Sequence, residues 1–474
     1  MTHVHWAYLI FAVLGMAAFW RLRPGTAVLL CVFGGWAALP VGQYPPFWPG
    51  QEGSEFPYWI IGLGLPSDML LTKAWVCPVV AAFGVLLFDF NSIKRFRPAW
   101  PDVIPVVWCL SPFAAALAGR TSDPAPWIGV LYLSTSWGLP WLLGRLYFST
   151  PDGLKQLARA VVLSAVIYLP ICLIEGIWQP RVYGWVYEVH PFCATSVDRY
   201  IGYRPIGFLE NGNQLGMWLA GAAVVAIWSA MVLPRPSASN RQQYVLAAVL
   251  GLLCLASQSA GAIILAVASL GLLQLFRWVR PRNTLLAVAI VGALGFGTYA
   301  SGVIPIRKLA ESNPVAQRLK SALSSAGRGS LGWRMAQDER HLKTAHRHVF
   351  LGHGEWDWWR EGQGRPWGMW LLIVGQFGIL GLLSSTAIWI YPAGRALWSM
   401  SRIAVVSAQG VIPAALAIVL LITFADSLLN SFVILPLLLI AGGMAVPPGP
   451  LPNLPSGPVR LPLRQGSEVG SGPP

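Results

Sequence analysis

Hydrophobic residues in this chain come in long continuous runs, separated by shorter polar segments rich in Arg, Pro and Gly. Each run approaches the roughly 20 residues with which a helix crosses about 30 Å of hydrocarbon. The ten-residue alternating segments of an outer-membrane barrel are missing from the pattern. The pattern predicts an all-α, polytopic membrane protein with about 12–13 transmembrane helices. The predicted spans lie near residues 4–20, 26–42, 73–90, 103–119, 127–147, 156–177, 213–233, 244–258, 260–276, 284–302, 367–392, 411–426 and 428–446.

Composition excludes a soluble fold. Of the 474 residues, 55% are hydrophobic and 11% are charged, whereas soluble domains carry about 25% charged residues. The net charge of +14 is weak evidence for nucleic acid, because cytoplasmic loops of membrane proteins are rich in Lys and Arg. We therefore expect membrane lipids as partners and no nucleic acid. Five of the six cysteines lie inside apolar segments and only Cys193 lies in a loop, so no disulfide framework is predicted. No CxxC or other metal-ligand spacing appears, so no metal site is predicted.

The basic residues of the short connections predict the orientation. They gather in alternating connections, such as Arg21 with Arg23, Lys94 with Arg97, and Arg277 with Arg282. By the positive-inside rule these connections face the cytoplasm. The N-terminus, which lacks a cleavable signal pattern, is then outside and the C-terminus cytoplasmic. Two long loops would face the periplasm or its equivalent.

This topology divides the chain into four parts. Helical stretches within the second long loop, near 313–323 and 333–347, predict a small helical extracytoplasmic cap. A Pro- and Gly-rich tail is expected to be disordered. The parts are a transmembrane bundle over 1–302 with outer loop 178–212, an outer loop with catalytic character over 303–366, C-terminal transmembrane helices over 367–446, and the tail 447–474.

The first long loop ends in Arg204 and runs directly into an apolar helix that begins near Asn213. An arginine beside a helix N-terminus suits an anion, because the guanidinium offers a bidentate fork and the helix offers free N–H groups. Phosphate is the obvious candidate, and Asn213 is a candidate contact for a glycan. Alternatively, Arg204 snorkels to the membrane interface and Asn211 or Asn213 only caps the helix.

The second long loop carries many cations and histidines. Arg334, Gln337 and His341 share one face of a predicted helix, at spacings i, i+3 and i+7. A cation and a titratable base would then meet one substrate. Arg328, earlier in the loop, is a further candidate for binding an anion. The alternative is a solvated basic surface attracted to anionic lipid headgroups.

Tryptophans and carboxylates follow in the same loop. Trp356 and Trp359 are candidates for stacking on sugar rings, and Glu355, Asp357 or His353 for acting as a base. Tryptophans are also ordinary interfacial anchors, and that reading stays open.

Taken in order, these segments resemble the O-antigen ligase and O-antigen polymerase family of bacterial envelope glycosyltransferases, over roughly residues 200–390. The first matching segment is R-x-x-G-x-x-x-N-x-N-x-x-G from Arg204 to Gly216. The second is Ser257 to Ala262, which is similar to an S-R-G-type helix start but has Ala260 in place of the basic residue. The third runs from Trp333-Arg334 through Gly352-His353-Gly354 to Gln376-Phe377-Gly378-Ile379-Leu380-Gly381.

The resemblance implies transfer of a polyprenyl-diphosphate-linked glycan to a hydroxyl of a glycan, lipid or protein acceptor, at the outer face and without cofactor or metal. Arg204, Arg334 and Arg328 would neutralise the leaving diphosphate. His341, His353 or Glu355 would take the acceptor proton.

One position departs from the family pattern. The His–Asn pair of the family falls, by ungapped counting back from Gly378, on Trp367-Gly368. The usual catalytic histidine is therefore unmatched, and either another histidine or carboxylate of the loop substitutes or the chemistry is lost. A transporter or flippase of lipid-linked sugars is the alternative function, and a non-catalytic component that binds anionic lipid is a third.

Overall fold

The computed structural model describes residues 3–41, 72–117, 126–178, 181–187, 190, 202–233, 237–302, 330–354, 358–359 and 366–446 and, between 303 and 329, only residues 313, 314, 317, 318 and 321. These residues form helices and no β-strand, which confirms the all-α prediction. The tail over 447–474, with its predicted disorder, lies outside the described residues, as does most of the predicted helical stretch over 313–323.

Each predicted span overlaps a helix or consecutive helical pieces. The single helices are α1 (His3–Arg21), α4 (Lys73–Phe88), α6 (Val103–Leu117), α9 (Pro151–Ile177), α11 (Gly212–Val232), α12 (Ser237–Ala256), α13 (Ala260–Leu275), α14 (Pro281–Ser301), α18 (Met369–Trp398), α20 (Val411–Ser427) and α21 (Leu435–Met444). The composite ones are α2 (Pro24–Leu29) with η1 (Leu30–Gly34) and α3 (Gly35–Ala38), and α7 (Pro126–Leu133) with η3 (Ser134–Gly138) and α8 (Leu139–Tyr147).

Several of these helices are long and apolar enough to cross a membrane. In the described part of the chain, six reach at least 18 residues with a strongly apolar window, and six more apolar helices have 10–17 residues. The chain therefore has the character of a helical polytopic membrane protein.

The last predicted span, 428–446, is wrong in its first part. Residues 430–434 are not helical, and α21 begins only at Leu435, with Pro436 in its first turn. The polar side chain of Asn430 bonds to Arg334 and Asp426, and these contacts hold this segment outside a continuous helix.

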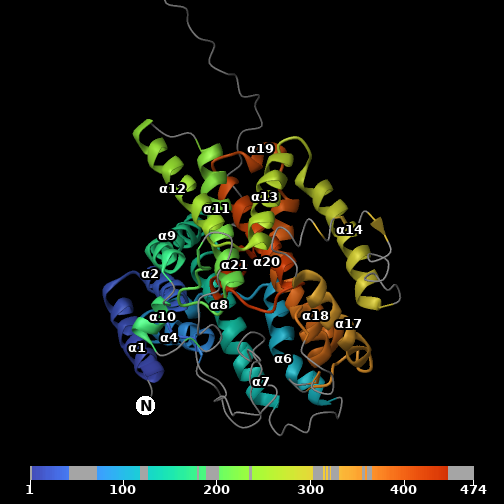
Figure 1. Cartoon of the computed structure of the whole chain (residues 1–474). Helices are drawn as coiled ribbons and strands as arrows, with labels where there is room; N and C mark the ends of the chain where they lie inside the picture. The colour runs from blue at the N-terminus through green and yellow to red at the C-terminus, as the bar shows by residue number, and fades with distance from the viewer. Residues whose placement is uncertain are drawn as a thin grey trace, which may run out of the picture.

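Burial divides the helices into central and peripheral ones. In the most apolar windows, 78% of the residues of α11 are buried and none of α14. Figure 1 shows α11, α20 and α21 in the middle of the bundle, with α1 and α14 at opposite edges. α1 turns large apolar side chains outward, among them Trp6, Ile10 and Val13.

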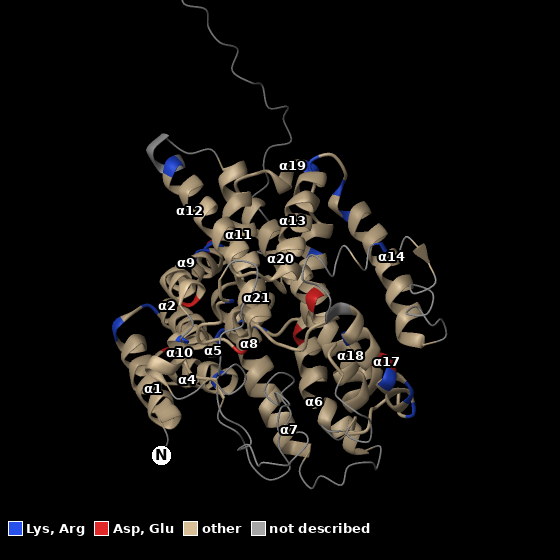
Figure 2. Cartoon of the chain, in the orientation of Figure 1, with Lys and Arg blue, Asp and Glu red and all other residues tan. Residues whose placement is uncertain are grey.

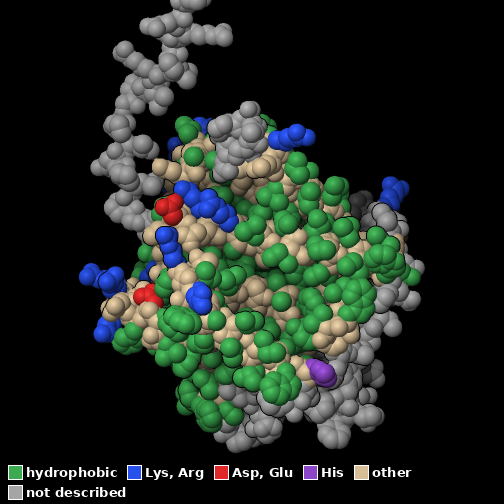
Figure 3. All heavy atoms as spheres, turned by 90° about the vertical axis from the view of Figure 1, so that its left-hand side faces the viewer, with side chains coloured by type: hydrophobic (Ala, Val, Ile, Leu, Met, Phe, Trp, Pro, Cys, Tyr) green, Lys and Arg blue, Asp and Glu red, His purple; other side chains and the backbone are tan. Residues whose placement is uncertain are grey.

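A wide hydrophobic surface covers the face drawn in Figure 3, with Lys and Arg side chains gathered towards its edges. Figure 2 shows that the basic residues lie mainly near helix ends and connections, such as those beside α12, α14, α17 and α19. An exposed apolar surface of this extent marks a region that lipid covers in a membrane protein.

The described part of the second long loop centres on α17 (Ser330–His346), which packs beside α18 (Figure 1). The prediction of a helix over 333–347 is thus confirmed. Leu342 and Ala345 are buried, so one face of α17 is anchored to the bundle. The remaining short helices are α5 (Phe90–Lys94), η2 (Trp100–Asp102), α10 (Val182–Val186) and α19 (Arg402–Val405).

Candidate functional site

A buried carboxylate shapes the loop that carries Arg204. Glu175, near the end of α9, is fully buried, and its oxygens accept hydrogen bonds from the backbone N–H groups of Val182, Ile206 and Gly207. The guanidinium of Arg181 lies 3.5 Å from Glu175 and donates to the carbonyl of Arg204 at 2.8 Å. The backbone at Arg204 is therefore fixed from both sides.

The side chain of Arg204 lies across the start of α11. A Cβ added at Gly212 would come within 2.4 Å of Nε of Arg204, so the glycine leaves the space that the guanidinium occupies. Nη2 of Arg204 donates to Oδ1 of Asn213 at 2.7 Å. The guanidinium is thus half-buried and bonded within the protein rather than extended to an interface.

Asn211 caps α11, as the alternative interpretation expected. Its Oδ1 accepts from the N–H groups of Asn213 and Gln214, at 2.9 and 3.0 Å. The expectation that these helix N–H groups are free for an anion is therefore wrong, because a local side chain already occupies them. Anion binding at this place has to rest on the guanidinium.

Asn430 helps to join Arg204 and Arg334, two of the three arginines that were predicted to bind diphosphate. Its Oδ1 accepts from Nη1 of Arg334 at 2.5 Å and from Nδ2 of Asn213 at 3.4 Å, while its Nδ2 donates to Asp426 at 2.9 Å. Arg204 and Arg334 come from loops far apart in the sequence, yet one chain of hydrogen bonds through two asparagines connects them. We call Arg204, Asn213, Asn430 and Arg334 the arginine network.

The segment from Ser257 to Ala262 lies against this network. Ser259 is the N-cap residue of α13, and its hydroxyl donates to Oδ1 of Asn213 at 3.4 Å. Gln258 has a φ of 52° and donates to the carbonyl of Tyr203 at 3.4 Å. Ala260, which stands where a basic residue was expected, begins α13.

The Gly352-His353-Gly354 turn forms backbone hydrogen bonds to α18 close to a break in that helix. The N–H groups of His353 and Gly354 donate to the carbonyls of Gly375 and Gln376, at 2.8 and 2.9 Å. At Gly378 the backbone leaves the helical conformation, with a φ of 66°. Two segments that carry the family resemblance therefore contact each other directly.

Trp367 stands where the family places its histidine, and it adjoins Arg334. The guanidinium carbon of Arg334 lies 5.6 Å from the centre of the Trp367 ring. The N–H groups of Trp367 and Gly368 both donate to Oδ1 of Asp338, at 2.7 and 3.3 Å. Asp338 sits four residues after Arg334 on α17.

Asp338 was not among the predicted site residues. Burial raises the pKa of its carboxyl to about 6, although the two N–H groups and the charge of Arg334 act in the opposite direction. Its i, i+4 spacing from Arg334 puts both on one face of the helix, and this spacing was the available sequence signal. A titratable group near neutrality beside a cation is typical of a functional site.

The predicted bases His341 and His353 gather around Trp358. The ring of His353 stacks on Trp358 with centres 5.8 Å apart, and that of His341 meets it edge-on at 6.2 Å. His353 Nε2 lies 3.0 Å from the carbonyl of Thr344. His341 is buried and lies seven residues from Arg334, about 10 Å along the helix. Their roles as bases stay predictions.

The other predicted residues are less informative. Trp359 is buried, so the protein itself covers the side chain that was expected to stack on a sugar. Arg328, Glu355, Trp356 and Asp357 lie outside the described residues. In the described part of the chain, no three His, Cys, Asp or Glu side chains come together as metal ligands would.

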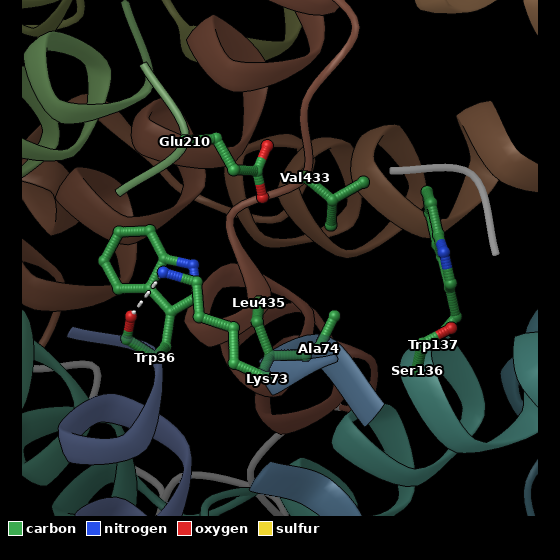
Figure 4. Close-up of a pocket in the computed structure, with 8 residues that line it drawn as sticks. All are labelled: Trp36, Lys73, Ala74, Ser136, Trp137, Glu210, Val433 and Leu435. Carbon is green, nitrogen blue, oxygen red and sulfur yellow. Dashed lines mark hydrogen bonds between the residues drawn. The ribbon is translucent and has the colours of Figure 1, made fainter. Parts of the chain in front are cut away.

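A small cavity with a mainly apolar lining contains the charged side chains of Lys73 and Glu210. Figure 4 shows Lys73, Glu210 and Trp137 bordering this cavity, whose volume of about 10 Å³ is roughly that of one water molecule. Lys73 Nζ donates to the carbonyls of Trp36 and Phe208, at 3.1 and 2.6 Å. The buried ammonium thus ties α4 to the loop that carries Arg204.

No family model and no curated protein matches this chain. The resemblance therefore rests on the segments themselves and on their position around the arginine network.

Proposed function

We propose that this protein is a membrane glycosyltransferase that moves a glycan from a polyprenyl-diphosphate carrier to an acceptor hydroxyl, in the manner of O-antigen ligases and polymerases. The observation that carries the proposal is the arginine network, in which hydrogen bonds through Asn213 and Asn430 connect Arg204 to Arg334. Two guanidinium groups joined through one hydrogen-bond network suit a diphosphate, because each offers parallel donors to phosphate oxygens.

In the proposed reaction the acceptor oxygen bonds to the anomeric carbon while the bond from that carbon to the diphosphate oxygen breaks. The bonding electrons go to the diphosphate, and negative charge grows there. Arg204 and Arg334 stabilise this charge, which is where fixed electrostatics contribute most to a rate. The amides of Asn213 and Asn430 hold the guanidinium groups until the diphosphate takes their place.

The acceptor proton goes to Asp338 in this proposal. Trp367 replaces the histidine of the family, and an indole N–H only donates, so it cannot serve as a base. The carboxyl of Asp338 accepts a hydrogen bond from the backbone N–H of Trp367, and the guanidinium of Arg334 lies beside the Trp367 ring. With a pKa of about 6 it is ionised at neutral pH and close to the value at which a general base is most effective.

The proposed setting is the bacterial inner membrane, with about 12–13 transmembrane helices and both long loops periplasmic. The alternating basic connections support this orientation. The apolar tail of the donor would lie in the lipid along the outward-facing side chains, while its diphosphate reaches the arginine network at the interface.

The test is transfer by the purified full-length protein in liposomes, with an undecaprenyl-diphosphate oligosaccharide as donor and EDTA present. We expect glycan transfer and release of the carrier, both lost in Arg204→Ala. Arg277→Ala serves as a control, because Arg277 is exposed at a helix end away from the network. Movement of the intact lipid across the bilayer without transfer would establish the flippase alternative instead.

A further inference from the structure

A second basic site lies at the opposite end of α4 from the Arg204 loop. Lys73, the first residue of α4, contacts that loop through the carbonyl of Phe208. The 16 residues of α4 span about 24 Å, which is most of the roughly 30 Å of a bilayer's hydrocarbon core. Past this far end come α5 and the cations Arg95 and Arg97.

These cations line an open pocket of about 270 Å³, formed by Ser92, Arg95, Phe96, Arg97, Arg145 and Leu146. Arg145 forms the fixed wall, since its guanidinium binds both carboxylate oxygens of Asp102, at 2.9 and 3.2 Å, and lies over the ring of Phe96. Arg95 and Arg97 form the open rim and are exposed.

The charge of the pocket is positive on balance. Within the described part of the chain, neither Arg95 nor Arg97 forms a salt bridge. The acidic groups nearby are Asp102, which Arg145 neutralises, and Asp89, which accepts from Ser92 and from Tyr147. Lys94 adds another cation beside the rim, over the ring of Phe90. The rim arginines are therefore available to an anion.

The pocket sits between the ends of two apolar helices. The last turns of α4 expose Phe83, Leu87 and Phe88, and the candidate span from Trp100 exposes Val103 and Val106. Trp100 itself is exposed and meets Tyr391 edge-on, and Trp and Tyr are enriched at membrane interfaces. Headgroups of the bilayer would thus lie at the level of the pocket, with acyl chains beside these apolar side chains.

We propose that this pocket binds the phosphodiester headgroup of an anionic glycerophospholipid. Arg95 and Arg97 would hold the phosphate, as basic pockets between transmembrane helices hold acidic lipids. The site is independent of the proposed glycosyltransferase activity, because it lies at the other end of α4 from the arginine network.

The test uses the full-length protein in detergent, with phosphatidylglycerol added and bound lipid counted by native mass spectrometry. We expect Arg95→Gln with Arg97→Gln to lower phosphatidylglycerol affinity by about tenfold or more, since one surface arginine contributes about fivefold. Arg277→Gln with Arg280→Gln, which removes the same charge elsewhere, should change it by less than about twofold. Arg95→Lys with Arg97→Lys should keep most of the phosphatidylglycerol binding, because both charges remain.

Three results would overturn the proposal: unchanged phosphatidylglycerol affinity in the Arg95 and Arg97 double variant, equal affinity for phosphatidylcholine, or displacement of the lipid by inorganic phosphate. The last would mean that the pocket takes a soluble phosphate. Phosphatidylglycerol binding and glycan transfer are measured separately. A protein that keeps one and loses the other shows that the two proposals can fail independently.

Discussion

Asn430 accepts hydrogen bonds from the side chains of both Arg334 and Asn213 and donates one to Asp426. In the sequence it lies in an apolar stretch, which led to the prediction that it belongs to a transmembrane helix. A lone amide in such a stretch is costly unless it is bonded, so its presence was itself a signal of a polar site. Asn430 connects segments that are far apart in the sequence, and a local sequence pattern does not reveal such a connection.

Removing the guanidinium of Arg334 should slow glycan transfer strongly. We expect Arg334→Gln to lower the rate by about 100-fold or more, because one lost donor to a developing oxyanion typically has an effect of this size. Arg334→Lys should keep part of the rate, since the charge remains without the fork. Arg340→Gln, on an exposed position of the same helix, is the matched control. A normal rate and product length in Arg334→Gln, at normal protein level, would remove this arginine from the mechanism.

The pH dependence of transfer should report Asp338. Its folded-state pKa of about 6 predicts that the rate falls as pH drops through about 6, because the protonated carboxyl cannot accept a proton. Asp338→Asn keeps an oxygen for the N–H groups of Trp367 and Gly368 but removes the base, so the rate should be low at every pH. Glu339→Gln should retain the wild-type profile.

Ionisation of Asp338 should raise the transfer rate but lower the stability of the protein as pH increases. The pKa is raised above its unfolded value near 4, so between about pH 4 and pH 6 the folded state binds more protons. Stability then decreases as pH rises through this window, and Asp338→Asn should abolish that part of the slope in thermal unfolding. A wild-type slope in the variant, or an unchanged activity profile, would mean that Asp338 only anchors the start of α18.

At the scale of elements, the break in α18 connects packing with the site. Gly378 has a left-handed φ of 66°, and the facing Gly352 has a φ of 75°. A Cβ at Gly378 would lie 2.2 Å from the carbonyl oxygen of Phe350. The turn at Gly352 and the break at Gly378 are therefore complementary, and together they position the connection from α17 to Trp367.

Gly378→Ala should destabilise the protein. A non-glycine residue in this conformation costs about 1–3 kcal/mol, and the contact with the Phe350 backbone adds to it. Gly394→Ala is the control in the same helix, because nothing lies within 4 Å of its added Cβ and alanine favours a helix over glycine. We expect a lower midpoint of thermal unfolding for the first variant and an unchanged or higher one for the second. Equal midpoints would show that the break has no role in stability.

For the whole molecule, the sequence was informative wherever a single physical rule decides the structure. The length of apolar runs located the helices from His3 to Met444, because lipid requires each span to satisfy its own backbone. The rule failed at 428–434, where Asn430 bonds across the fold, and it was silent on Asp338, whose pKa depends on burial by distant segments. A shared role for Arg204 and Arg334 was suggested only by the family resemblance, since no local pattern encodes a hydrogen-bond network between two distant segments.

Orientation in the membrane is the property of the whole molecule that can be tested most directly. α14 has 21 residues between Pro281 and Ser301, about 31 Å of helix, so its two ends lie on opposite faces of a bilayer that it crosses. Arg280 precedes it, and α17 follows it by way of the loop that begins at residue 303. The positive-inside rule puts Arg280 in the cytoplasm and α17 outside.

In a background with Cys193→Ser, the other five cysteines are buried and should not react. An impermeant maleimide added to intact cells should then label Lys343→Cys, at an exposed position of α17, and should label Arg280→Cys only after the cells are opened. The reverse pattern would place the arginine network on the cytoplasmic side, where a periplasmic acceptor cannot reach it, and the proposed function would fail with the topology.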